Sequence, residues 1–177
     1  MIIQTDRLEL RPYKDEDFEF LYSLFSDPDV VRFIGNGQTR DREGAMEFLY
    51  WIYRSYKTDP NLGLRVLVRK KDRKLVGHAG LVKQTINGAE ELEIGYWIAK
   101  DYWGQGYATE AAKALKEYGT RRLGKERFIS LIQPGNLASR KVAERIGMVL
   151  EEEILLAGRE VYVYSIEQEE LHGISNA

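Results

Sequence analysis

The chain of 177 residues contains no cysteine, only two histidines and only four prolines. Without cysteine there is no disulfide, no thiolate metal ligand and no cysteine nucleophile, so any group transfer must use other chemistry. The histidines, His78 and His172, lie in unlike contexts, one in a strand-like run and one near the C-terminus. We therefore expect no catalytic metal, because imidazole and thiolate are among its commonest ligands.

Long apolar runs and an excess of basic residues are also missing. No segment approaches the roughly 20 apolar residues of a membrane helix, and charge follows the first methionine too closely for a signal peptide. The 26 Lys and Arg residues against 28 Asp and Glu residues leave a net charge of −2, which gives no general attraction to phosphate backbones. We expect a cytoplasmic protein without a nucleic-acid or membrane partner.

Apolar material for one full core is present, since 44% of the residues are hydrophobic and 11% aromatic. No linker-like stretch divides the chain, so we expect a single domain over residues 1–170 and a flexible tail over 171–177. Alternating apolar residues predict strands near 7–11, 64–68, 75–82, 92–98, 128–132, 149–155 and 160–166. Apolar spacings of three and four predict helices around 18–25, 46–56, 108–118 and 142–146.

Turn and capping residues mark the ends of these elements. Asp27-Pro28 stops the first helix, and Asn87-Gly88 is typical of a tight hairpin turn. The third helix is expected to end near Gly119, and the fourth at Gly147. Three central strands then form an antiparallel meander between helices, and this order predicts an α+β fold.

The most specific motif is the loop Trp103-Gly104-Gln105-Gly106-Tyr107-Ala108-Thr109, which joins a strand to a helix. Its glycines let backbone N–H groups approach an anion, and the helix N-terminus adds unpaired donors. The loop can bind pyrophosphate, or it can be an ordinary tight turn. It is neither a Rossmann fingerprint, which needs an early βαβ unit, nor a P-loop, which needs Gly-Lys-Ser or Gly-Lys-Thr.

This loop resembles the cofactor loop of the GNAT acetyltransferases, in which Gln or Arg is followed by two residues, Gly, one residue, and Gly or Ala. Gly106 and Ala108 fill the last two positions, whereas Trp103 stands where Gln or Arg is usual. Further segments, 5–12, 93–98 and 136–148, are similar to the ribosomal-protein alanine acetyltransferase (RimJ/RimL-like) branch. The resemblance covers nearly the whole chain.

The resemblance implies a mixed, mostly antiparallel twisted sheet of about seven strands flanked by about four helices. The strands at 92–98 and 128–132 would diverge into a V-shaped slot for the pantetheine arm of acetyl-CoA. Asn136 would contact the pantetheine amides, although an Asn at this position also suits a helix cap. The implied contacts to acetyl-CoA are Trp97, Ile98, Ala99, Trp103, Gly104, Gln105, Gly106, Tyr107, Ala108, Thr109 and Asn136.

Glu93 is the candidate general base, because it belongs to the strand beside the cofactor. A carboxylate there would be partly desolvated, and this would raise its pKa towards a useful range. Glu91 and His78 are the alternatives.

Ser139 lies one helical turn beyond Asn136, so the two side chains can face the same way. In the resembling branch a serine here can protonate the departing CoA thiolate, and Tyr96 is the alternative acid. Aromatic residues over 48–56 either border the acceptor pocket or pack in the core.

The expected activity is transfer of an acetyl group from acetyl-CoA to a primary amine by direct attack in a ternary complex. The amine is either a protein N-terminus or a small molecule. The competing interpretation is a non-catalytic acyl-CoA-binding sensor or assembly module. The acceptor, and the choice between monomer and homodimer, stay open at this level.

Overall fold

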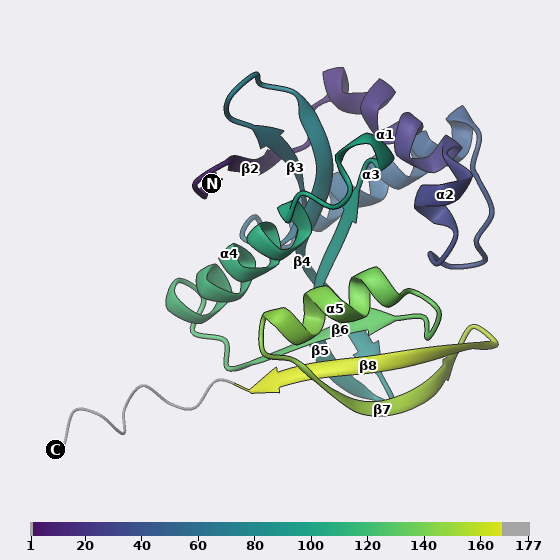
Figure 1. The fold of residues 1–177 in the computed structure, drawn as a ribbon, viewed down its shortest axis with the longest axis vertical. Coiled ribbons are helices and arrows are strands. Elements are labelled where there is room, and N and C mark those ends of the chain that lie inside the picture. The colour runs from purple at the N-terminus through teal and green to yellow at the C-terminus, as the bar shows by residue number, and fades with distance from the viewer. Residues whose placement is uncertain (1, 168–177) are drawn as a thin grey trace, which may run out of the picture.

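The computed structural model describes residues 2–167, which form an eight-stranded sheet with helices on both faces (Figure 1). The strand order is β1-β2-β3-β4-β5-β6-β8-β7. The strands are β1 (Ile3–Gln4), β2 (Leu8–Pro12), β3 (Gly63–Arg69), β4 (Leu75–Ile86), β5 (Ala89–Ile98), β6 (Arg127–Ile132), β7 (Val149–Leu156) and β8 (Arg159–Glu167). The helices are η1 (Asp15–Asp17), α1 (Phe18–Ser26), α2 (Pro28–Val31), α3 (Arg42–Thr58), η2 (Lys100–Tyr102), α4 (Tyr107–Arg121) and α5 (Leu137–Arg145), where η marks a 3₁₀-helix.

The predicted α+β fold with a mixed, mostly antiparallel sheet is confirmed. Several short elements were not expected. The two-residue strand β1 pairs with β2, placing Ile3 opposite Leu10. Asp27-Pro28 stops α1 as predicted, but it also begins α2, because the Asp27 carboxylate accepts a hydrogen bond from the backbone N–H of Asp29 at 2.9 Å. The expected tail over 171–177 lies outside the described residues.

The third helix ends near Gly119, as expected, but this glycine does not cap it. Helix α4 continues to Arg121, and Gly119 is buried within it. A Cβ atom on Gly119 would lie 2.5 Å from a ring carbon of Phe128 in β6. The glycine is therefore required because the helix and the strand pack closely, and it does not mark a helix end.

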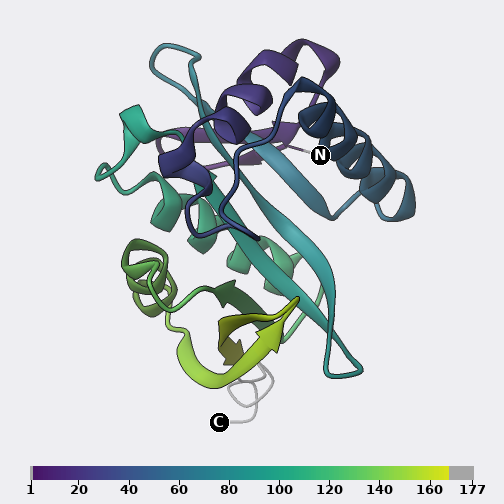
Figure 2. The ribbon, with the colours of Figure 1, turned by 90° about the vertical axis from the view of Figure 1, so that its right-hand side faces the viewer.

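Alternation along β5 divides its side chains between two cores. Leu92 and Ile94 pack against α4 in a cluster that includes Ala111 and Leu115. Trp97 packs on the opposite face, among side chains of α1 and α3. The long strands β4 and β5 thus run through the middle of the molecule with a helical layer on each side (Figure 2).

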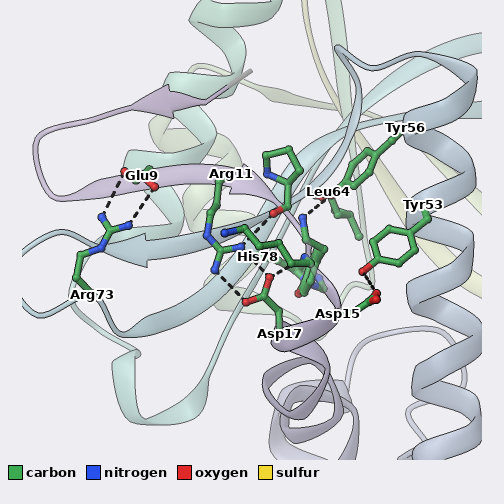
Figure 3. A network of polar contacts seen from close by, with 12 residues as sticks. Glu9, Arg11, Asp15, Asp17, Tyr53, Tyr56, Leu64, Arg73 and His78 are labelled. Atoms are coloured by element: carbon green, nitrogen blue, oxygen red, sulfur yellow. Dashed lines mark hydrogen bonds and ion pairs between the residues drawn. The ribbon is translucent and has the colours of Figure 1, made fainter.

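The α1–α3 layer is fastened to the sheet by polar contacts (Figure 3). Arg11 of β2 makes two hydrogen bonds to the carboxylate of Asp17, at 2.7 and 2.9 Å. Tyr53 of α3 donates to Asp15 at 2.7 Å, and Tyr56 donates to the backbone carbonyl of Leu64 in β3. These contacts fix α3, whose inner side faces the centre of the sheet.

The sheet opens between β5 and β6, where the V-shaped slot was expected. These parallel strands are paired at one register position, Glu93 opposite Ile129. The Ser130 hydroxyl donates to the backbone carbonyl of Ile94 at 2.8 Å, so a side chain replaces a ladder bond at the point of separation. Beyond it, β5 continues to Ile98 without pairing to β6.

Candidate active site

The glycine loop leads into the N-terminus of α4. Gly104 and Gly106 have φ angles of 74° and 81°, in the left-handed region that glycine adopts without strain. The first backbone hydrogen bond of α4 runs from the N–H of Glu110 to the carbonyl of Gly106. The N–H groups just before it therefore have no acceptor within the helix and are available to an anion.

Trp103 anchors the loop to the end of β5. Its indole N–H donates to the backbone carbonyl of Ile98 at 2.7 Å, while its ring is about half exposed. The residue that replaces the usual Gln or Arg thus fixes the loop against the strand. Ala99 continues the connection, since its N–H donates to the carbonyl of Val76 at 2.9 Å.

The N-terminal segment braces the same loop, and sequence reasoning missed this contact. Thr5 donates to the Glu110 carboxylate at 2.6 Å, and the Arg7 side chain donates to it at 2.7 Å. Arg7 also donates to the carbonyl of Gln105 at 2.9 Å and lies 4.5 Å from the centre of the Tyr107 ring. The sequence carries no local signal for this pairing, because the partners are about a hundred residues apart.

The start of α5 lies at the other side of the slot. Asn136 caps this helix, because its side-chain oxygen accepts a hydrogen bond from the N–H of Ser139 at 3.2 Å. The Tyr96 hydroxyl donates to the carbonyl of Ser139 at 2.9 Å. The two candidate acids are therefore neighbours, and the capping role considered for Asn136 is confirmed.

Glu93 lies where β5 leaves β6. Its carboxylate accepts hydrogen bonds from the Gln84 amide at 2.9 Å and from the N–H of Leu131 at 3.4 Å. Burial raises the pKa of Glu93, and the two hydrogen bonds only partly offset that rise. The direction of this shift is the one that makes a carboxylate a stronger base.

Glu91 and His78, the alternative bases, are each held by other partners. Glu91 forms an ion pair with Arg127 at 3.0 Å, and Arg127 also binds Glu151. His78 is fully buried with one ring nitrogen 2.6 Å from the Tyr13 hydroxyl. Burial lowers the pKa of His78 to about 3, so its ring stays neutral at physiological pH.

A cavity of about 600 Å³ opens on the α1–α3 face of the sheet beside Glu93. Of the aromatic residues of α3, Phe48 and Trp51 line it, whereas Tyr53 and Tyr56 are engaged in the contacts described above. The aromatic part of the wall consists of Phe25, Phe33, Phe48, Trp51, Tyr96 and Trp97.

Within residues 2–167, no helix is both long and apolar enough to span a membrane. The same part of the chain holds no group of three or more His, Cys, Asp or Glu side chains arranged to bind a metal ion.

Comparison with known proteins identifies the family. A family model for the acetyltransferase (GNAT) domain matches residues 7–149. The protein YkkB of Bacillus subtilis is 37% identical over 163 residues, which span 90% of this chain and 92% of YkkB. A GNAT-family acetyltransferase from Bacillus anthracis has a TM-score of 0.80 at 30% identity, over 96% of this chain and 100% of that one.

The ribosomal L7/L12 acetyltransferase RimL, solved with coenzyme A, shares the fold, with a TM-score of 0.79 at 21% identity over 95% of this chain and 98% of RimL. The chain belongs to the GNAT acetyltransferase family, and it is an acetyl-CoA-dependent N-acetyltransferase.

The hydrogen bonds from Thr5 and Arg7 to Glu110, which we call the brace on the glycine loop, predict a pH-dependent contribution to stability. Burial alone would raise the pKa of Glu110, but hydrogen bonds from Thr5 and Arg7 outweigh it and lower the pKa. Glu110→Gln should reduce the free energy of unfolding at pH 7 by about 1 kcal/mol. A group with a lowered folded-state pKa stabilises only while ionised, so the deficit should disappear as the pH falls through that pKa.

Urea unfolding at pH 7 and pH 3 measures this difference. Glu117→Gln is the matched control, because Glu117 lies on the same helix in an exposed ion pair with Arg121 at 3.0 Å. It should change the free energy of unfolding by no more than about 0.5 kcal/mol. A deficit in Glu110→Gln that is equally large at both pH values would contradict the brace.

Proposed function

We propose that the chain moves an acetyl group from acetyl-CoA directly to a primary amine, on a small molecule or a protein N-terminus, while both are bound. The position of Glu93 carries the proposal, because its carboxyl group lies where β5 and β6 separate and also lines the aromatic cavity. A donor in the slot and an amine in the cavity would meet at this carboxyl group. A non-catalytic binding module has no use for such a junction.

The donor would lie along the slot. The N–H groups of the loop 103–109 would hold its pyrophosphate, and Arg7 would add the positive charge that the loop itself lacks. The pantetheine arm would follow residues 97–99 of β5, where strand edge groups are not paired to β6. Asn136, at the start of α5, would meet the same arm from the opposite side.

Acetyl-CoA affinity tests the loop. Gly106→Ala places a side chain at φ 81°, with Arg7 at 3.4 Å as the nearest neighbour of the new atom. Strain in the left-handed conformation should cost about 1–2 kcal/mol of stability. Acetyl-CoA should bind at least about tenfold more weakly in isothermal titration calorimetry, because the N–H groups that surround Gly106 shift.

Gly88→Ala is the matched control. Gly88 has φ 80° and open space around it, but it lies in the β4–β5 hairpin turn. The two variants should lose similar stability, while Gly88→Ala keeps wild-type affinity. Equal acetyl-CoA affinity in both folded variants would exclude the loop as the pyrophosphate site.

The reaction requires one proton to leave the amine and one to reach the thiolate. Glu93 takes a proton from the bound ammonium group, and the neutral amine that results attacks the thioester carbonyl carbon and forms the C–N bond. The C–S bond then breaks, the thiolate sulfur takes a proton from the Ser139 hydroxyl, and Ser139 regains a proton released by the acylated nitrogen. Alignment of two bound substrates would contribute up to about 7–11 kcal/mol, so weak catalytic groups suffice.

Glu93→Gln should lower kcat/KM by about 100-fold near neutral pH, where the acceptor is protonated and needs a base. The loss should shrink as the pH approaches the pKa of the acceptor amine. Glu91→Gln is the control, since it alters a carboxyl group of the same strand that is held by Arg127. If Glu93→Gln keeps the wild-type pH–rate profile, the base lies elsewhere.

Ser139 is better placed than Tyr96 to act as the acid. Among the described residues its hydroxyl has no hydrogen-bond partner, whereas the Tyr96 hydroxyl proton is engaged by the Ser139 carbonyl. Burial also raises the pKa of Tyr96 above its ordinary value, which makes that proton harder to release.

Ser139→Ala should lower kcat without changing acetyl-CoA affinity, because only the departing thiolate needs the proton. Its effect should diminish with an acetyl donor whose thiol has a lower pKa and leaves unaided. Tyr96→Phe is measured in parallel with both donors. A donor-dependent loss in Tyr96→Phe, together with its absence in Ser139→Ala, would assign the acid to Tyr96.

A further inference from the structure

We propose that the acceptor is a small amine that carries an anionic group on an apolar or aromatic body. The proposal rests on the function proposed for the cavity and deepens it. It follows from three features of the cavity: the charges on its wall, its aromatic lining, and the part of the wall formed by the α2–α3 connection.

The cavity wall carries more basic than acidic side chains, whereas the whole chain has a small excess of acidic ones. Arg40 and Arg159 line the cavity, and neither makes an ion pair with any described residue. Glu93 is the carboxylate on this wall, and it already accepts hydrogen bonds from Gln84 and Leu131. A cavity with two unpaired guanidinium groups, in a chain of net charge −2, favours a ligand with an anionic group.

Arg159 is placed on the same face of the sheet as Glu93. It begins β8 directly after the turn at Ala157 and Gly158, and it lies two residues before Val161, which also lines the cavity. Because alternate strand residues share a face, its guanidinium group is directed to the Glu93 side of the sheet. In our proposal a single acceptor molecule places its amine at Glu93 and its anionic group at Arg159.

The body of that molecule would be apolar, because aromatic rings form a continuous wall. The ring centres of Phe25 and Trp97 are 5.2 Å apart, and those of Phe48 and Trp51 are 5.1 Å apart. The guanidinium group of Arg40 lies 5.0 Å from the centre of the Phe25 ring. A polyamine or an amino sugar would leave this wall without apolar contact.

The cavity fits a small molecule better than a polypeptide. Its volume of about 600 Å³ is typical of small-molecule sites. The α2–α3 connection forms part of its wall, and a hydrogen bond of 2.9 Å from the Gln133 amide to the carbonyl of Gly35 holds the connection in place. Phe33 packs against Gly135, where a Cβ would approach its ring to 2.9 Å. A peptide chain would have to open this connection.

Matched pairs of amines that differ by one carboxylate test the proposal. Phenylalanine is compared with 2-phenylethylamine, and 4-(aminomethyl)benzoate with benzylamine, by release of CoA thiol from acetyl-CoA. Spermidine, glucosamine and a short peptide complete the panel. At least one carboxylated member should have a kcat/KM about tenfold or more above its partner, as expected for a charge-assisted hydrogen bond.

Arg159→Gln should remove that preference while leaving the uncharged partner nearly unchanged. Arg54→Gln is the matched control, because Arg54 is an exposed arginine of α3 outside the cavity lining. The same pairs are titrated as their N-acetyl products into the CoA-bound protein. Binding that prefers the carboxylate and needs Arg159, without turnover of any amine, would support the acceptor class and reject the proposed transfer.

Equal use of both members of each pair, or a preference that Arg159→Gln leaves intact, would overturn the acceptor class while acetyl transfer stands. Preferred turnover of the peptide would do the same and would identify a polypeptide acceptor. If no amine of the panel is turned over and no N-acetyl product binds, the proposed acceptor class is overturned. If acetyl-CoA binds under the same conditions, the absence of turnover also counts against the proposed acetyl transfer.

Discussion

The separation of two neighbouring strands is the constraint on which the rest of the structure depends. β5 and β6 meet at one register position, and beyond it their backbone groups need other partners. At the point of separation, side chains supply them: Ser130 bonds to the Ile94 carbonyl, and Glu93 accepts from the Leu131 N–H. The carboxyl group is thus held in the sheet by the geometry that opens the slot. In our proposal the donor completes the strand edge and meets the base at the same point.

In our proposal, alternation along the strands keeps the two substrates apart until they reach that point. The face that carries Ile94 packs against α4, whose N-terminus receives the glycine loop. The opposite face carries Glu93 and Trp97 and opens into the aromatic cavity. Because successive strand residues point to opposite faces, a single strand can serve a cofactor on one side and an acceptor on the other. In that arrangement the sheet would separate the two sites, and the slot would be the opening between them.

The glycine loop depends on the far end of the chain. Backbone at positive φ is adaptable, so a loop built from glycine needs outside contacts to hold one geometry. Trp103 supplies one contact to β5, and Arg7 with Thr5 supplies the others through Glu110 and the Gln105 carbonyl. The short β1–β2 segment therefore belongs functionally to the loop.

Most of the secondary structure, the α+β order and the family could be predicted from the sequence, because hydrophobic period, capping residues and the glycine loop are local properties of the chain. Gly119 shows the limit of such signals, since a glycine required by the Phe128 ring looks the same in sequence as one that ends a helix. Glu91 and Glu93 likewise have the same residue type and the same strand phase. Only the tertiary structure distinguishes the two carboxylates. Glu91 is paired with Arg127, whereas Glu93 lies at the point where the sheet opens. The sequence by itself determined which elements form and in what order; burial and partners, which come from distant residues, decided which carboxylate faces the cavity.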